Sequence, residues 1–263
     1  MGFENLFEPS RLLTYFLIIM RMGGIFFTAP VFSSSSLNNQ VRMILVLVIS
    51  LLLLPVVTPV TITDPNLLWL VISVTKEILI GVCIGGMTSL LFSGLQLGGY
   101  LVDYQMGFSM VSIIDPTTNS NVSYSGQVYN LLGTLIFLAI YGHHIFMRAV
   151  TQSFEFMPVG DFNVTKDAMM YVISTFIKIF VIAIQITAPV FIALMVTNVI
   201  MGILARLVPQ MNIMVIGFPV KITIGALMLI ASLQLFYIAY EKVIFEYFRQ
   251  IKKFFEINGL AGG

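Results

Sequence analysis

The chain has 263 residues, of which 58% are hydrophobic and only 10% are charged. Soluble domains carry about a quarter charged residues, so this composition indicates an integral membrane protein or part of a membrane assembly. The net charge of +1 gives no reason to expect a nucleic-acid partner. The single cysteine, Cys83, excludes an internal disulfide framework.

Uncharged apolar stretches of about 18 residues or more are long enough to span a bilayer as helices. A strand alone in lipid leaves its backbone groups unpaired, so each such stretch is expected to be helical. Prolines interrupt several of them, at Pro30, Pro55, Pro189 and Pro219. We therefore predict an all-α, membrane-associated fold with about six long, proline-broken helices, at 22–41, 43–63, 78–102, 127–147, 179–205 and 222–240.

A few charged residues lie in or beside these apolar segments. Charges in such positions are costly and are often functional. Glu77 is the one carboxylate near a helix interior and it adjoins a lysine, which makes a poor acid relay for a proton-coupled transporter. We expect these charges to lie at interfaces or to pair between helices: Arg21, Lys76, Glu77, Lys178, Arg206 and Lys221.

The third segment carries small residues at helical spacing. Such residues let helix backbones approach closely, whereas glycine without a packing role destabilises a helix. We therefore expect this helix to be buried among others. The predicted subunit-packing residues are Gly81, Gly85, Ser89 and Ser93, with Gly94 and Gly98 on a neighbouring stripe.

The stretch "DYQMGFSMVSIIDPTTNSNVSYSGQ" (103–127) is too apolar at its front for a solvated loop and too polar at its back for a span. Irregular backbone at membrane depth is tolerated only inside protein or along a water-filled cavity. A plain surface loop is the alternative. The apolar members of the insert are Met106, Phe108, Met110, Ile113 and Ile114; its chain-breaking and short polar members include Gly107, Asp115, Pro116 and Asn119.

No catalytic constellation is found along the chain. His143 and His144 are neighbours, so on a helix they point about 100° apart and cannot both ligate one metal ion. No phosphate-binding loop, Cys-x-x-Cys or His-Glu-x-x-His motif occurs. We expect no cofactor, no metal and no enzyme activity.

The stretch "RLVPQMNIMVIGFPVKI" (206–222) predicts a tight helical hairpin, because Pro209 cannot continue a helix. Amides and an arginine would stand at its tip, and a proline and a glycine would soften the start of the last helix. The hairpin residues are Arg206, Pro209, Gln210, Asn212, Gly217, Pro219 and Lys221.

The final apolar helix is expected to continue into "YEKVIFEYFRQIKKFFEI" (240–257), lying along the membrane interface or against a partner. Four of the thirteen lysines and arginines fall in this tail, so the positive-inside rule places the C-terminus in the cytoplasm.

The hairpin sequence resembles the signature of the FliR family, the R subunit of the flagellar type III export apparatus, which is homologous to the injectisome T subunit. The stretches "RMGGIFFTAPVFSSSSLNNQVRMILVLVISLLLLP" (21–55), "KEILIGVCIGG" (76–86) and "YGHHIFMRAVTQSFEFMPVG" (141–160) are also similar to that family. The resemblance covers roughly residues 11 to 250.

The resemblance implies a fusion of P-type and Q-type export subunits, with a plug loop between the third and fourth helices that closes an export channel. It divides the chain into a P-like part (1–105), the plug loop (106–125), the fourth helix with its connection (126–170), and a Q-like hairpin with its tail (171–263). The hairpin would then lie at the cytoplasmic entrance.

The implied setting is the bacterial inner membrane, in the flagellar basal body. Implied partners are P-type and Q-type gate subunits, the export switch protein of the B type, unfolded flagellar substrates and membrane lipid. Two alternatives stay open: a virulence injectisome homologue of the same subunit, and a small-solute secondary transporter. No inverted repeat supports the transporter.

Overall fold

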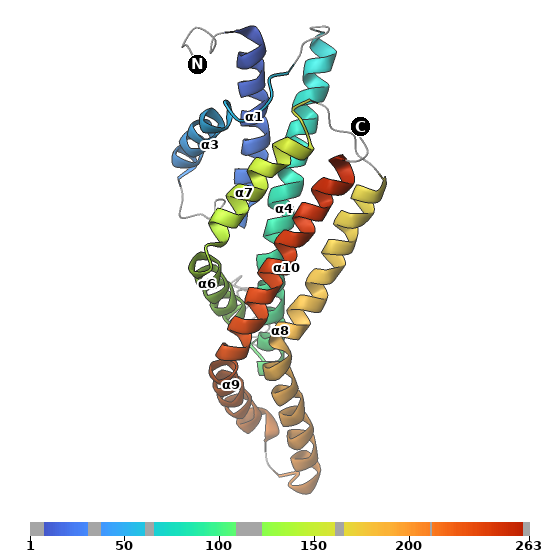
Figure 1. The fold of residues 1–263 in the computed structure, drawn as a ribbon. Helices are drawn as coiled ribbons and strands as arrows, with labels where there is room; N and C mark the ends of the chain where they lie inside the picture. The colour runs from blue at the N-terminus through green and yellow to red at the C-terminus, as the bar shows by residue number, and fades with distance from the viewer. Residues whose placement is uncertain are drawn as a thin grey trace. The chain divides into compact units, whose positions relative to one another are not determined.

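The computed structural model describes residues 8–30, 38–60, 66–108, 123–160, 166–210 and 212–259. Within these ranges the regular structure is helical, which confirms the all-α prediction (Figure 1). The helices are α1 (Pro9–Thr28), α3 (Asn39–Leu53), α4 (Leu67–Met106), α6 (Tyr124–Ala139), α7 (Gly142–Phe156), α8 (Lys166–Leu207), α9 (Ile213–Ala231) and α10 (Leu233–Gly259).

The chain forms two compact units. The first consists of Met1–Leu91, Tyr141–Phe176 and Glu246–Gly263, and the second of Phe92–Ile140 and Ile177–Phe245. The long helices α4, α8 and α10 each contribute one part to each unit. Residues far apart in sequence therefore meet within each unit.

Two helices continue through charged residues, Arg21 and Glu77, at which the predicted helices were expected to begin. The prediction of 22–41 for the first helix was wrong, because α1 runs from Pro9 to Thr28 and contains Arg21. The third helix was predicted to start at residue 78, yet α4 begins at Leu67 and contains Glu77. Both charges are buried inside the first unit, where they pair with each other.

Other boundaries differ for local reasons. The 127–147 segment divides into α6 and α7, because Tyr141 adopts a left-handed conformation with φ of 57°. The last segment divides too: α9 ends at Ala231 and α10 begins at Leu233, with a bend of 58° between them. Pro219 lies inside α9, which begins at Ile213, so its predicted place at the start of the last helix was wrong.

Three described helices are long and apolar enough to cross a membrane: α1, α4 and the Met169–Leu207 part of α8. The count reaches five if the pairs α6–α7 and α9–α10 each make one bent span. Many large apolar side chains on α3, α4, α8 and α9 are exposed in the single chain. An exposed apolar surface of this extent indicates a membrane protein that contacts lipid or other subunits.

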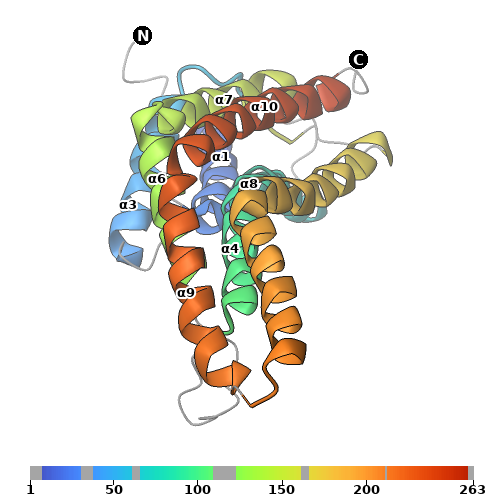
Figure 2. The same ribbon diagram turned by 90° about the horizontal axis from the view of Figure 1, so that it is seen from below.

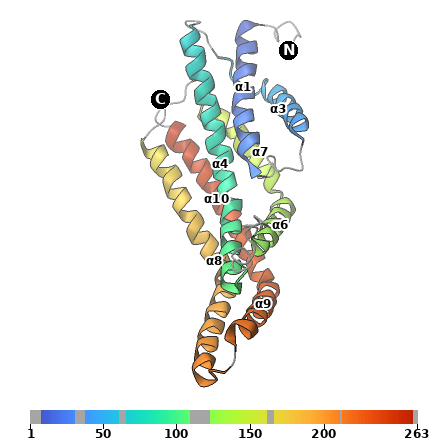
Figure 3. The same cartoon turned by 180° about the vertical axis from the view of Figure 1, so that it is seen from behind.

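In the first unit, α1 crosses α4 at glycines on both helices (Figure 3). A Cβ added at Gly24 would lie 2.8 Å from the carbonyl oxygen of Ile78 and 3.1 Å from the Cα of Gly81. A Cβ at Gly85 would lie 2.7 Å from the carbonyl oxygen of Ile25. The two backbones are therefore in direct contact, as small residues allow.

We expect Gly81→Ala to destabilise the protein and Gly86→Ala to leave it unharmed. The new methyl at Gly81 would clash with the carbonyl oxygen of Arg21, whereas a Cβ at Gly86 has nothing within 4 Å. Overpacking typically costs about 1–3 kcal/mol, and relief of an unneeded helical glycine gains roughly 0.5–1 kcal/mol. Thermal unfolding in detergent measures the effect of each substitution on stability. Equal Tm values for the two variants would contradict the close backbone contact between α1 and α4.

In the second unit, glycines again mark close helix contacts. Gly99 of α4 meets the backbone of Gly126 at the start of α6. A Cβ at Gly98 would lie 3.0 Å from the carbonyl oxygen of Ala183 in α8. The second part of α8 and α9 run side by side and meet at a tight turn (Figure 2). This turn is the predicted helical hairpin.

Candidate functional site

The two ends of the insert are joined by a buried carboxylate in the second unit. Asp103, in the last turn of α4, accepts hydrogen bonds from the hydroxyl of Ser123 at 2.7 Å and the backbone N–H of Ser125 at 3.1 Å. Ser123 is the N-cap of α6, and its hydroxyl accepts from the backbone N–H of Gly126 at 2.9 Å. A carboxylate at a helix N-terminus is stabilised by the free N–H groups and the helix dipole.

We call residues 103–108 and 123–126 the neck of the insert. Asp103 is 4% exposed, so its negative charge is held almost entirely by these donors. Hydrogen bonds to an ionised group are about twice as strong as neutral ones. The neck therefore holds the end of α4 against the start of α6.

The neck also packs on the hairpin helices of the same unit. A Cβ at Gly225 of α9 would clash with the side chain of Met106, and one at Gly107 would clash with the ring of Phe218. Gly107 has a φ of +91°, a conformation that favours glycine. Gln105 accepts a hydrogen bond at 2.9 Å from the side-chain amide of Asn198 in α8. The start of the insert therefore contacts the hairpin helices α8 and α9, although the sequence predicted these two features separately.

Three of the predicted plug residues are described. Met106 ends α4 and is 3% exposed, Gly107 forms the turn, and the ring centroid of Phe108 lies 5.7 Å from that of Tyr124. The other predicted plug residues lie outside the described residues: Met110, Ile113, Ile114, Asp115, Pro116 and Asn119.

The small-residue ladder of α4 does not face one partner. Gly81 and Gly85 contact α1 in the first unit, whereas Gly98 contacts α8 in the second. Ser93 is exposed; Gly94 is buried, and Ser89 is half-buried. The glycines are used within the chain, and the role of the ladder in packing between subunits stays a prediction.

The hairpin tip is exposed in the single chain. Arg206, Pro209, Gln210 and Asn212 all lie on its surface. Deeper in the hairpin, Gly217 is buried, and a Cβ there would lie 3.4 Å from the terminal methyl of Met201. Pro219 lies within α9, where its carbonyl accepts from the hydroxyl of Thr223 at 2.8 Å, and Lys221 is half-buried.

A buried ion pair in the first unit joins α1, α4 and α7. The guanidinium of Arg21 donates to both carboxylate oxygens of Glu77, from Nε at 2.5 Å and from Nη2 at 3.0 Å. Its remaining donors reach the backbone carbonyls of Ser153 at 3.1 Å and Met157 at 3.0 Å. Glu77 also accepts from the backbone N–H of Gly160 at 3.0 Å. Both side chains are 0% exposed.

For Arg21 and Glu77 this pairing confirms the expectation that charges in the apolar segments lie at interfaces or pair between helices. For Lys76, Lys178, Arg206 and Lys221 it stays a prediction. The guanidinium of Arg21 also lies 4.2 Å from the ring centroid of Phe154 on α7, which adds a cation–π contact. Sequence reasoning noted both charges and did not identify them as partners. The available signal was that two opposite charges inside apolar runs must each find a partner.

No group of three metal-ligating side chains occurs in the described part of the chain. The rings of His143 and His144 lie edge to face with centroids 4.5 Å apart, and the Tyr141 ring lies 5.9 Å from that of His144. The three rings form an aromatic cluster at the start of α7.

Long apolar helices, backbone contacts at glycine and buried charges held inside the helix packing define an all-α integral membrane protein. The chain belongs to the family of bacterial export proteins, family 1, whose model matches residues 12–247. This match confirms the family resemblance drawn from the sequence motifs.

Curated relatives carry the name flagellar biosynthetic protein FliR. The chain is 33% identical to the one from Bacillus subtilis over 171 residues, which cover 64% of this chain and 66% of the relative. It is 30% identical to that of Pectobacterium carotovorum over 219 residues, 82% of each chain. The relative from Aquifex aeolicus is 26% identical over 253 residues, 96% of this chain and 98% of the relative.

Proposed function

We propose that this protein is a subunit of the flagellar protein-export gate in the bacterial inner membrane. There it forms, with P-type and Q-type subunits, the channel through which unfolded flagellar proteins pass. The observation that carries the proposal is the family match along nearly the whole chain, together with relatives named as flagellar biosynthetic proteins. Those names favour a flagellar over an injectisome role.

In this proposal the insert helps to close the pore. The neck supports it, because Asp103 holds the two ends of the insert together at a buried point. Residues 109–122 can then act as a plug without any separation of α4 from α6. The apolar part of the insert would exclude water from the lumen, as hydrophobic constrictions do in other channels.

The exposed apolar faces and the exposed hairpin tip are suited to assembly with other subunits. Large apolar side chains cover the outer sides of α8 and α9, among them Ile184, Ile192, Val199 and Leu227. The hairpin tip carries one exposed cation, Arg206, and two exposed amides, Gln210 and Asn212. We assign the tip to the cytoplasmic entrance of the channel, where the export switch protein of the B type would bind. The same proposal divides the chain into a P-like and a Q-like part. The protein acts without catalysis.

We expect Arg206→Ala, and the double change Gln210→Ala with Asn212→Ala, to impair motility through faulty assembly. Exposed side chains contribute within about 0.5 kcal/mol to folding, so the Tm of the single chain should stay unchanged. Loss of an interfacial cation should lower the yield of co-purified P-type and Q-type subunits roughly tenfold, equivalent to about 1.4 kcal/mol.

The matched control is Arg148→Ala, which removes an exposed arginine from α7. It should retain full motility and full complex yield. If the hairpin variants swim and assemble as the control does, the hairpin has no role at the entrance or in assembly. If no P-type or Q-type subunit co-purifies with the unaltered chain, the export-gate assignment itself fails.

A further inference from the structure

A polar pocket lies in the first unit, between the first two turns of α1 and the segment that follows α3. Its volume is about 200 Å³, and it is lined by Arg11 and Thr14 of α1 and by residues 54–59. The hydroxyl of Thr14 accepts from the backbone N–H of Val60 at 3.0 Å and donates to the carbonyl of Ser10 at 2.7 Å. This hydroxyl therefore joins the segment after α3 to α1.

Arg11 brings a positive charge without a partner into this pocket. Its Nε is buried and has no hydrogen-bond acceptor, and the guanidinium forms no ion pair within the described ranges of the chain. A buried donor without an acceptor is costly, and more so when the donor is charged. An acceptor from outside the described chain would remove this cost.

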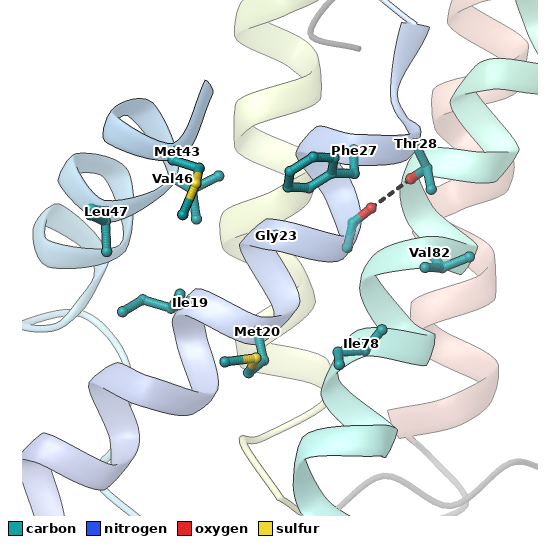
Figure 4. A pocket seen from close by; sticks show the side chains of 11 residues that line it. Ile19, Met20, Gly23, Phe27, Thr28, Met43, Val46, Leu47, Ile78 and Val82 are labelled. Atoms are coloured by element: carbon teal, nitrogen blue, oxygen red, sulfur yellow. Dashed lines mark hydrogen bonds between the residues drawn. The ribbon is translucent and has the colours of Figure 1, made fainter. Parts of the chain in front are cut away.

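A larger, apolar groove between α1, α3 and α4 in the same unit contains no comparable donor (Figure 4). Thr28 is the one polar side chain among the residues that line it, and its hydroxyl donates to the carbonyl of Gly24 at 2.7 Å. A ligand with charged oxygens is therefore better matched by the pocket at Arg11 than by the groove.

The start of α1 adds to the positive potential at the pocket. Arg11 lies in the first turn of this helix, where the helix dipole places a partial positive charge, and the turn contains no acidic residue. The N-cap residue Glu8 is exposed, and its side chain makes no capping hydrogen bond. A guanidinium presents its donors in a planar fork that matches the oxygens of a phosphate group. The charge and the donors of the pocket therefore fit phosphate.

The surroundings of the pocket favour a lipid as the source of the phosphate. Because α1 is long and apolar enough to cross a membrane, its first turn lies at the depth of the lipid headgroups. Large apolar side chains are exposed near the pocket on both helices: Leu12 and Phe16 of α1, and Leu51 and Leu52 of α3. A phospholipid has a phosphate for the cation and acyl chains for these side chains, whereas a free anion has only the first.

We propose that this pocket binds the headgroup phosphate of a phospholipid. Arg11 donates to the phosphate oxygens, and the acyl chains lie along the exposed apolar side chains of α1 and α3. Hydrogen bonds between ionised groups are about twice as strong as neutral ones. The bound lipid would fasten the start of α1 to the segment that follows α3.

The test uses the full-length chain in detergent and native mass spectrometry, which detects bound lipid by its mass. Dioleoylphosphatidylglycerol should bind, whereas dioleoylglycerol has the same acyl chains without phosphate and should bind about tenfold more weakly. Arg11→Gln should lower the affinity for the phospholipid about tenfold, equivalent to about 1.4 kcal/mol. The matched control is Arg148→Gln, which removes the charge of an exposed arginine on α7 and should leave the affinity unchanged.

A second variant and a competitor complete the test. If Arg11→Gln fails to fold, Thr58→Trp fills the pocket from its exposed side and should lower the affinity in the same way. Inorganic phosphate should fail to displace the lipid. Displacement by inorganic phosphate would make a free anion the ligand and overturn the lipid as its source. Equal binding of the two lipids would overturn recognition of the phosphate. An affinity that Arg11→Gln and Thr58→Trp both leave unchanged would overturn the site.

Discussion

Arg21→Ala and Glu77→Ala are each expected to destabilise the protein by about 3–5 kcal/mol, the usual cost of breaking a buried ion pair. Each change leaves an unpaired charge inside the first unit, where both side chains are 0% exposed. Loss of Arg21 also removes a donor from the carbonyl groups of Ser153 and Met157, although that of Ser153 keeps the backbone N–H of Met157. Thermal unfolding in detergent and the yield of folded protein measure the effect.

Replacing both partners separates two effects: the cost of leaving one buried charge unpaired, and the loss of the attraction between the two charges. Arg21→Met with Glu77→Leu removes both charges and keeps apolar volume, so we expect it to be milder than either alanine variant. The matched control is Arg249→Ala, which breaks the Arg249–Glu246 pair, 79% and 54% exposed. Exposed pairs contribute about 0.2–1 kcal/mol. If Arg21→Ala shifts the Tm no more than this control, the buried pair does not hold α1, α4 and α7 together.

Deletion of residues 109–114 is expected to open an ion leak through the assembled gate. The deletion removes the apolar half of the insert and keeps the neck, so Asp103 can still hold Ser123 and Ser125. Without apolar surface to exclude water, a polar lumen wets and conducts. Conductance of the complex in a planar bilayer should rise several-fold, and cells that over-express it should grow slowly.

A deletion of equal length in the polar half, residues 117–122, is the control. It shortens the insert by the same amount, removes a single apolar residue, Val122, and leaves the apolar residues of 109–114 in place, so conductance should stay close to that of the unaltered gate. An assembled complex that lacks 109–114 and conducts like the unaltered one would show that the insert is a surface loop.

Much of the architecture could be predicted from local sequence properties. Low charge and long apolar runs require a membrane, and lipid requires helices because no water is present to pair with the backbone. Pro209 marks the hairpin turn, since proline lacks the N–H that a helix needs. These features depend on residues close together in sequence.

The sequence by itself determined the class of protein, its all-helical character, the hairpin and its family. Only the tertiary structure decided that Arg21 pairs with Glu77, that Gly24 crosses Gly81, and that Asp103 closes the neck. Each of these contacts joins different helices, and helical periodicity carries no information about which helices meet. Arg21 and Glu77 also show why helix boundaries were misplaced: a charge ends an apolar run in the sequence, but a helix continues through it when a partner 56 residues away satisfies it.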